Sequence, residues 1–159
     1  MAKVKAIPKG RRSITPNLVC PIPDGAIDYY KKVFDATEVV RVPGPGGKIM
    51  HAELKIGDSS IFVNDPMSES LARYAEVPAN HSIYLHLYVK DANAVFQRAI
   101  QEGAQIKMPL QDMFWGDRYG QIIDPFGQQW GIATHIEDVS PEEMSRRQQE
   151  MFGKAAHQN

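Results

Sequence analysis

The sequence predicts an α+β protein in which one structural unit occurs twice. Residues 13–65 and residues 82–135 each read as a strand, then a helix, then a run of strands. Neither unit can bury its own sheet, so we expect the two to pack together as a single domain around a concave surface. Residues 66–81 are expected to link the two units, and a C-terminal helix is predicted over residues 140–152.

Each unit opens with a strand and an amphipathic helix. Apolar and polar residues alternate from Ile14 to Cys20 and again from Ile83 to Val89, which is the period of a strand with one apolar face. The helices that follow are predicted from apolar residues three and four positions apart. These residues are Ala26, Ile27, Tyr30, Val33 and Phe34 in the first unit, and Ala92, Val95, Phe96, Ala99 and Ile100 in the second. Asp91 is expected to cap the second helix, and Gly103 to end it.

The remaining strands are predicted from alternation and turn residues. Residues 48–56 and 60–64 read as a hairpin joined by a Gly57-Asp58 turn. The second unit shows strand signals over residues 105–108, 119–123 and 129–134, with a turn at residues 124–127. Trp130 alternates with its neighbours on the last of these strands, and we expect it to face the helix as part of the core.

Composition excludes several classes of protein. The 159 residues, 43% of them hydrophobic, suffice for one core without a metal or a disulfide. A formal net charge of −1 argues against nucleic acid as a partner. No apolar run is long enough to span a membrane or to form a signal peptide, so we expect a cytoplasmic protein with no membrane partner. The single cysteine, Cys20, is expected to be buried. The basic N-terminal residues are expected to form a solvated arm, namely Lys3, Lys5, Lys9, Arg11 and Arg12.

Several segments together form a recognisable pattern, namely residues 14–19, 51–59, 85–89, 114–120, 124–127 and 133–135. They resemble the PhnB-like branch of the glyoxalase/bleomycin resistance/dioxygenase superfamily, also called the vicinal oxygen chelate proteins. The resemblance covers the chain from about Ile7 to Arg147. It implies two βαβββ modules that form curved mixed sheets around a concave cleft. Isomerases, dioxygenases, thiol transferases and drug-binding proteins share this scaffold, so the resemblance does not choose the chemistry.

The resemblance also implies where metal ligands would lie, on the first and last strands of each module. These positions fall on Thr15 and Asn64 in the first module, and on Tyr84 and Gly131 in the second. None of the four is a nitrogen, sulfur or carboxylate donor that holds zinc, nickel or iron firmly. We therefore expect no cofactor at the superfamily site, while a divalent metal at a displaced site stays open.

Polar residues on the strands are expected to face the cleft, because the apolar positions pack on the helices. His51 and Glu53 are candidate catalytic residues, two positions apart on one strand face, for proton transfer or, with His86, for a non-standard metal. A hydrogen-bonded pair that closes the cavity wall, or an exposed face at a subunit edge, would give the same pattern. The candidate ligand-binding residues are Asn17, Asn64, Tyr84, His86, Tyr88, Trp115 and Arg118.

Trp115 and Arg118 each allow two interpretations. Trp115 is either a wall for a planar ligand or a plug between subunits. Arg118 is either an anchor for an anionic substrate or a member of a surface ion pair.

Three functions fit the sequence. The first is a metal-independent protein that binds a small molecule, with a planar or zwitterionic ligand in two equivalent clefts of a homodimer. The second is a metalloenzyme of the glyoxalase or extradiol dioxygenase type that uses His51, Glu53 and His86. The third is a metal-free isomerase or lyase with Glu53 or His51 as general base. A two-fold homodimer is expected in each case, because the resemblance implies that two-module chains usually complete their clefts across such an interface and because Met144, Met151 and Phe152 need an apolar partner. The C-terminal helix could dock either on its own module or across the two-fold axis, and the sequence leaves both open.

Overall fold

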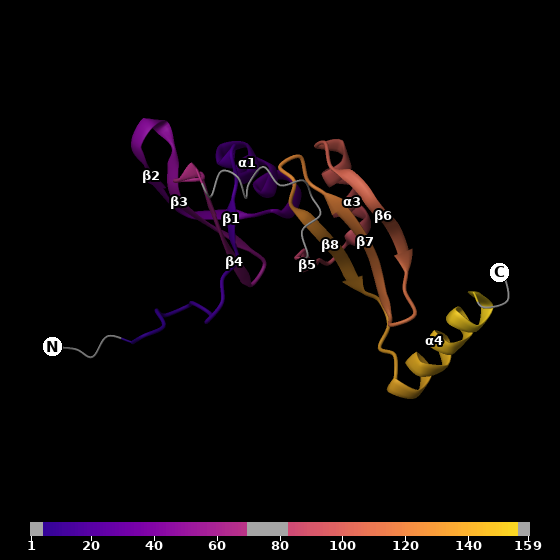
Figure 1. Cartoon of the computed structure of the whole chain (residues 1–159). Helices are drawn as coiled ribbons and strands as arrows, with labels where there is room; N and C mark the ends of the chain where they lie inside the picture. The colour runs from indigo at the N-terminus through magenta and orange to yellow at the C-terminus, as the bar shows by residue number, and fades with distance from the viewer. Residues whose placement is uncertain (1–4, 70–82, 156–159) are drawn as a thin grey trace. The chain divides into compact units, whose positions relative to one another are not determined.

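The computed structural model describes residues 5–69 and 83–155, and the chain divides into two compact units, Met1–Val77 and Pro78–Asn159. Each unit contains one four-stranded mixed sheet with a helix packed on one face (Figure 1). The predicted α+β class with two βαβββ modules is therefore confirmed. Most of the predicted linker, residues 66–81, lies outside the described residues.

The first unit has the strand order β1-β4-β3-β2, with β1 parallel to β4 and the other pairs antiparallel. Its elements are β1 (Asn17–Val19), α1 (Pro23–Phe34), β2 (Thr37–Pro43), the short 3-10 helix η1 (Pro45–Gly47), β3 (Ile49–Ile56) and β4 (Ser59–Asn64). Gly57 ends the β3 strand with a φ of 57°, which suits the tight turn predicted at residues 57–58. All five residues predicted for the apolar face of α1 are buried.

Two features of the first unit differ from the sequence prediction. Ile14 is 84% exposed and lies before β1, so the strand begins three residues later than the alternation suggested. Strand β2 was not located individually, because a bulge between Glu38 and Val40 breaks the alternation of its side chains. Burial of Cys20 is confirmed.

The second unit repeats the topology with the strand order β5-β8-β7-β6, in which β5 is parallel to β8. Its elements are β5 (Leu85–Tyr88), α3 (Ala92–Gln101), β6 (Gln105–Asp112), β7 (Asp117–Ile123), β8 (Gln129–His135) and α4 (Pro141–Ala155). Strand β5 begins at Leu85, and Ile83 before it is exposed.

Helix α3 follows the prediction at both ends. The Asp91 carboxylate accepts a hydrogen bond of 3.0 Å from the Ala94 amide, and Gly103 takes a φ of 100° just past the helix.

Trp130 is 2% exposed, as expected for a core residue. Its indole donates to one oxygen of Asp124 at 2.9 Å, while the other oxygen accepts from two amides of the turn before β8. Asp124 therefore joins the turn to the core.

Helix α4 begins where the sequence predicts, since the Ser140 hydroxyl accepts a hydrogen bond of 3.2 Å from the Glu143 amide. It extends beyond residue 152 to Ala155. Met151 and Phe152 are exposed on its surface. Among the residues described, no helix is long and apolar enough to cross a membrane.

Candidate functional site

The sheet of the second unit has two faces of different character. One face packs on α3. On this face, a Cβ added to Gly120 would lie 2.8 Å from the ring of Phe96, which belongs to α3. The buried residues Ile122 and Trp130 are paired with each other in the register of β7 and β8. Side chains alternate along strands, so their neighbours point to the opposite face. That opposite face carries four rings, His86, Tyr88, Trp115 and Tyr119, which we call the aromatic face.

The rings of the aromatic face contact one another in a continuous series. His86 stacks on Tyr119 with ring centroids 5.2 Å apart and planes 14° apart. Tyr88 lies 4.8 Å from His86 at a tilt of 53°, and Trp115 lies 6.0 Å from Tyr119 at 59°. Tyr119 is buried, whereas Tyr88 is 59% exposed and His86 is also exposed. The face thus presents flat apolar surface to solvent above a buried ring.

A buried carboxylate holds this face in place. Asp117 is 2% exposed and accepts hydrogen bonds from the Tyr88 hydroxyl at 2.7 Å and from the Trp115 indole at 3.0 Å. Its other oxygen lies 2.8 Å from Nδ1 of His135. Burial acts to raise the pKa of Asp117, but the hydrogen bonds from His135, Tyr88 and Trp115 outweigh it and hold the pKa below its ordinary value. Asp117 is therefore the charged centre of the site.

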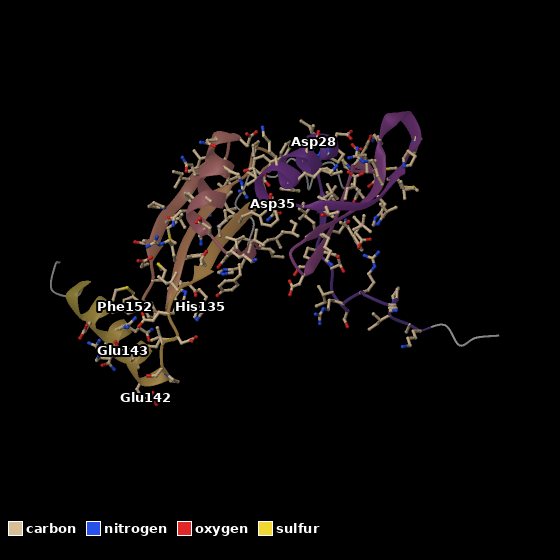
Figure 2. The ribbon with its side chains drawn as sticks, turned by 180° about the vertical axis from the view of Figure 1, so that it is seen from behind. Asp28, Asp35, His135, Glu142, Glu143 and Phe152 are labelled. Atoms are coloured by element: carbon tan, nitrogen blue, oxygen red, sulfur yellow. The ribbon has the colours of Figure 1, made fainter. Side chains whose placement is uncertain are left out.

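His135 lies at the end of β8 (Figure 2). In the register of β7 and β8 it is directly opposite Asp117. Its Nε2 lies 2.9 Å from the carboxylate of Asp138. Hydrogen bonds to Asp138 and Asp117 raise the pKa of His135 above its ordinary value. In turn, the hydrogen bond to Asp117 raises the pKa of the Tyr88 hydroxyl.

Sequence reasoning did not select Asp117 and His135. The strand signal in β7 begins only at Tyr119, so alternation in the sequence does not place Asp117 opposite His135. The Asp117↔His135 register at the ends of β7 and β8 is the signal that would have identified them.

Gly131 makes room for the buried ring. A Cβ at this position would lie 2.8 Å from Cε2 and 2.9 Å from the hydroxyl oxygen of Tyr119, and 3.3 Å from Nδ1 of His86. The Tyr119 hydroxyl accepts a hydrogen bond of 2.7 Å from Gln121, and burial and a hydrogen bond with Tyr84 raise its pKa. The space where the resemblance places a metal ligand is thus occupied by aromatic rings.

The four positions implied for a metal do not fit one. Thr15, Tyr84 and Gly131 offer no strong donor, and the Asn64 amide donates to the Asp65 carbonyl at 2.7 Å. Within residues 5–69 and 83–155, no group of three or more His, Cys, Asp or Glu side chains is placed to hold a metal ion.

In the first unit, the candidate residues share the sheet face that points away from α1. The register places Asn17 and Glu53 beside Phe62, and the His51 ring lies 4.7 Å from that of Phe62 at 66°. Glu53 is 4% exposed and forms a two-pronged ion pair with Arg11, whose guanidinium also lies 5.4 Å from the centre of the Phe62 ring.

This ion pair corrects the prediction of a wholly solvated N-terminal arm. The Arg11 guanidinium donates to both oxygens of Glu53 and so competes with a substrate for this carboxylate. Asn64 is buried on the same face. No sequence pattern predicts this contact, because Arg11 lies in a segment without strand or helix periodicity.

The second unit brings together Tyr84, His86, Tyr88 and Trp115 of the candidate ligand-binding residues. Arg118 is not among them. It alternates with Asp117 and Tyr119 along β7, and it forms an ion pair with Asp112 of β6, with hydrogen bonds of 2.7 and 3.0 Å. Its position matches the second interpretation of this residue, a surface ion pair.

Comparisons with known proteins agree with the fold. The family model described as "Glyoxalase/Bleomycin resistance protein/Dioxygenase superfamily" matches residues 15–132. Uncharacterized protein Mb0911c from Mycobacterium bovis is 38% identical over 135 residues, which are 83% of this chain and 89% of that protein. The crystal structure of TioX from Micromonospora sp. ML1 is similar with a TM-score of 0.60 and 26% identity, over 81% of this chain and 100% of that one. A PhnB protein from Bacillus cereus is similar with a TM-score of 0.59 and 19% identity, over 77% and 99% of the two chains.

Proposed function

Because the chain belongs to the Glyoxalase/Bleomycin resistance protein/Dioxygenase superfamily, we propose a function that this scaffold can serve without a metal, the binding of a small aromatic molecule. The ligand would lie on the aromatic face of the second unit. The observation that carries the proposal is a set of contacting rings, partly exposed, whose polar ends are fixed by a buried carboxylate.

Rigid exposed rings favour binding for two physical reasons. The hydrogen bonds of Tyr88 and Trp115 to Asp117 restrict both side chains before any ligand arrives, which lowers the entropy cost of binding. Each aromatic pair formed with a ligand contributes about 0.5–1.5 kcal/mol beyond the area that it buries. A planar bicyclic ligand that contacts two rings would gain about 1–3 kcal/mol in this way.

The two enzymatic alternatives receive less support. A general base at Glu53 or a displaced metal at His51 and Glu53 both require a carboxylate that is free to react or to coordinate. The ion pair with Arg11 engages both oxygens of Glu53. Binding on the aromatic face requires no such rearrangement, and we therefore prefer it.

The proposal includes membership of the PhnB-like branch and a homodimeric assembly. The branch is supported by the sequence segments quoted above and by the similarity to the Bacillus cereus PhnB protein. The dimer is supported by α4, where Met151 and Phe152 are exposed on a helix that carries few other apolar residues. A second copy of the chain would cover them.

Binding can be tested with 2-naphthamide, a neutral planar probe. At about 0.3–0.4 kcal/mol per non-hydrogen atom, its thirteen atoms predict a Kd on the order of 0.1–1 mM. Calorimetric titration into the millimolar range should therefore give a saturable signal. Cyclohexanecarboxamide, which lacks a flat ring, should bind more weakly.

Two substitutions locate the binding site. Tyr88→Leu removes an exposed ring but keeps an apolar side chain, and should weaken 2-naphthamide binding roughly fivefold to tenfold through loss of one ring contact. The matched control is Ile106→Leu, an exposed apolar residue of the same sheet that pairs with Ile122 on the α3 side. The proposal is wrong if 2-naphthamide does not bind, or if Tyr88→Leu and Ile106→Leu bind it equally well.

The two tryptophans offer a second readout. Trp115 belongs to the aromatic face, whereas Trp130 is buried in the core. Fluorescence quenching by 2-naphthamide should persist in Trp130→Phe and disappear in Trp115→Phe. The reverse result would place the ligand elsewhere.

A further inference from the structure

We propose that His135 is a recognition residue for an acidic group, so that the aromatic face selects aromatic monocarboxylates. The ligand ring would stack on Tyr88 and Trp115, and its carboxylate would accept a hydrogen bond from Nε2 of His135 in place of Asp138. This inference rests on the proposed function, because it names the class of ligand for the same site.

The first step is the position of His135 beside the rings. Its Nδ1 lies 2.8 Å from Asp117, whose second oxygen accepts from both Tyr88 and Trp115. A single carboxylate therefore connects the imidazole to two members of the aromatic face. Because a carboxylate only accepts, Asp117 also fixes the ring orientation and favours a proton on Nδ1, while Nε2 faces Asp138.

The second step is that a carboxylate already occupies the proposed position. Asp138 lies 2.9 Å from Nε2 of His135, and its side chain is fully exposed. An exposed ion pair of this kind is weak and exchanges readily with solvent. A ligand carboxylate held in addition by ring stacking can therefore replace Asp138 without leaving a buried group unpaired.

The charged groups around His135 also favour a ligand carboxylate. His135 lies between the carboxylates of Asp117 and Asp138, and their hydrogen bonds favour its protonated form. Nearby, Glu137 is already paired with Arg147 of α4, and the Tyr88 hydroxyl donates to Asp117. The negative charge of Asp117 is offset by three hydrogen-bond donors. Exchange of Asp138 for a ligand carboxylate thus preserves the charge arrangement that the structure shows.

Lys107 provides a rival anchor and hence a control. It belongs to β6 and its ammonium donates to Gln129 at 2.9 Å, at the opposite end of β8 from His135. If the acidic group of a ligand were held by Lys107, substitution of that residue would remove the preference for carboxylates. Our inference requires that Lys107→Gln leave the preference in place.

The experiment compares 2-naphthoate with 2-naphthamide, which have the same ring system and differ in charge. Calorimetric Kd values are measured at pH 6 and pH 9. At pH 6 the carboxylate should bind roughly tenfold more tightly, as expected for a charged hydrogen bond formed in exchange for Asp138. At pH 9 the preference should vanish, because His135 loses its proton as the pH rises.

Two variants assign the effect to His135. His135→Gln should abolish the preference for 2-naphthoate at pH 6. Asp138→Asn removes the internal competitor, so it should increase the affinity for 2-naphthoate roughly threefold and leave 2-naphthamide unaffected. The Asp138 variant does not depend on the fold tolerating a change at His135, because its side chain is fully exposed.

Three results would overturn the inference while the proposed function stands: equal binding of both probes at pH 6, a preference that survives at pH 9, or a preference lost in Lys107→Gln. If neither probe binds, the proposed function fails and this inference fails with it.

Discussion

Gly131 is a position where a single added methyl group should disturb both the packing of the sheet and the aromatic face. In Gly131→Ala the new Cβ would lie 2.8 Å from Cε2 and 2.9 Å from the hydroxyl oxygen of Tyr119. Real Cβ atoms essentially never approach this closely, so the Tyr119 ring must move. That ring stacks on His86 and is hydrogen-bonded to Gln121, so its displacement disturbs the aromatic face as well as the packing.

The expected cost follows from overpacking. A methyl group inserted into a packed site destabilises by about 1–3 kcal/mol. Part of this is recovered by the β-strand preference for alanine over glycine, about 0.5–1 kcal/mol. With the midpoints of these two ranges, about 2 and about 0.75 kcal/mol, the net loss of unfolding free energy should be about 1 kcal/mol, measured by urea denaturation. Binding of 2-naphthamide to the folded protein should weaken as well.

Two other glycines serve as controls. Gly120→Ala would place a Cβ 2.8 Å from Phe96 on the α3 side, so it should destabilise the protein without changing 2-naphthamide affinity. Gly153→Ala meets nothing within 4 Å in α4, so it should be neutral or slightly stabilising. The reasoning fails if Gly131→Ala is as stable as the unmodified protein, or if Gly120→Ala weakens binding to the same degree.

Three further predictions concern other parts of the chain. Arg11→Met keeps an apolar stem over Phe62 but leaves the buried Glu53 without its cation, so it should destabilise by about 1–3 kcal/mol in urea denaturation. Its neighbour Arg12, exposed, is the control, and an equal loss in Arg12→Met would contradict the role of the ion pair. The pKa of Asp117 is lowered in the folded state, so its stabilising effect is present above the ordinary carboxyl pKa and is lost as the pH falls below it. Asp117→Asn should therefore lose less stability between pH 5 and pH 2.5 than the unmodified protein does, and an unchanged acid dependence would argue against this. Finally, light scattering should give a dimer mass at micromolar concentration, and truncation after Asp138 should shift it towards monomer if α4 bridges the subunits. A monomer mass for the full chain would refute the dimer.

The repeated architecture was predictable because strand and helix periods are local properties. The apolar positions of α1 depend only on their spacing, and all of them are buried as expected. The cap at Asp91 depends on one side chain and one amide three residues away. By contrast, β2 was missed because a bulge shifts the side chains of Val39 and Val40 out of alternation, and only pairing with β3 shows that the strand continues.

The candidate site was predictable only in part, for a related reason. Alternation along β5 placed His86 and Tyr88 together on one side of the sheet. The contacts between Asp117 and His135, and between Arg11 and Glu53, join residues 18 and 42 positions apart. Such contacts depend on strand register and on the path of an irregular segment, and neither leaves a periodic signal in the sequence.

In β8 of the second unit, the titratable residue lies four positions away from the position where the resemblance implies a metal ligand. At residue 131, where the resemblance implies a metal ligand, the absence of a side chain admits the Tyr119 ring. Four residues further along, on the same face of the strand, His135 supplies a titratable nitrogen held by a buried carboxylate. Residues 131, 133 and 135 share this face because side chains alternate with a period of two. An aromatic wall with a cation at its end recognises a flat acid, whereas a metal in the same place would polarise a substrate oxygen. Glycine at the implied ligand position and His135 at the end of β8 therefore support our proposal of ligand recognition rather than Lewis-acid catalysis.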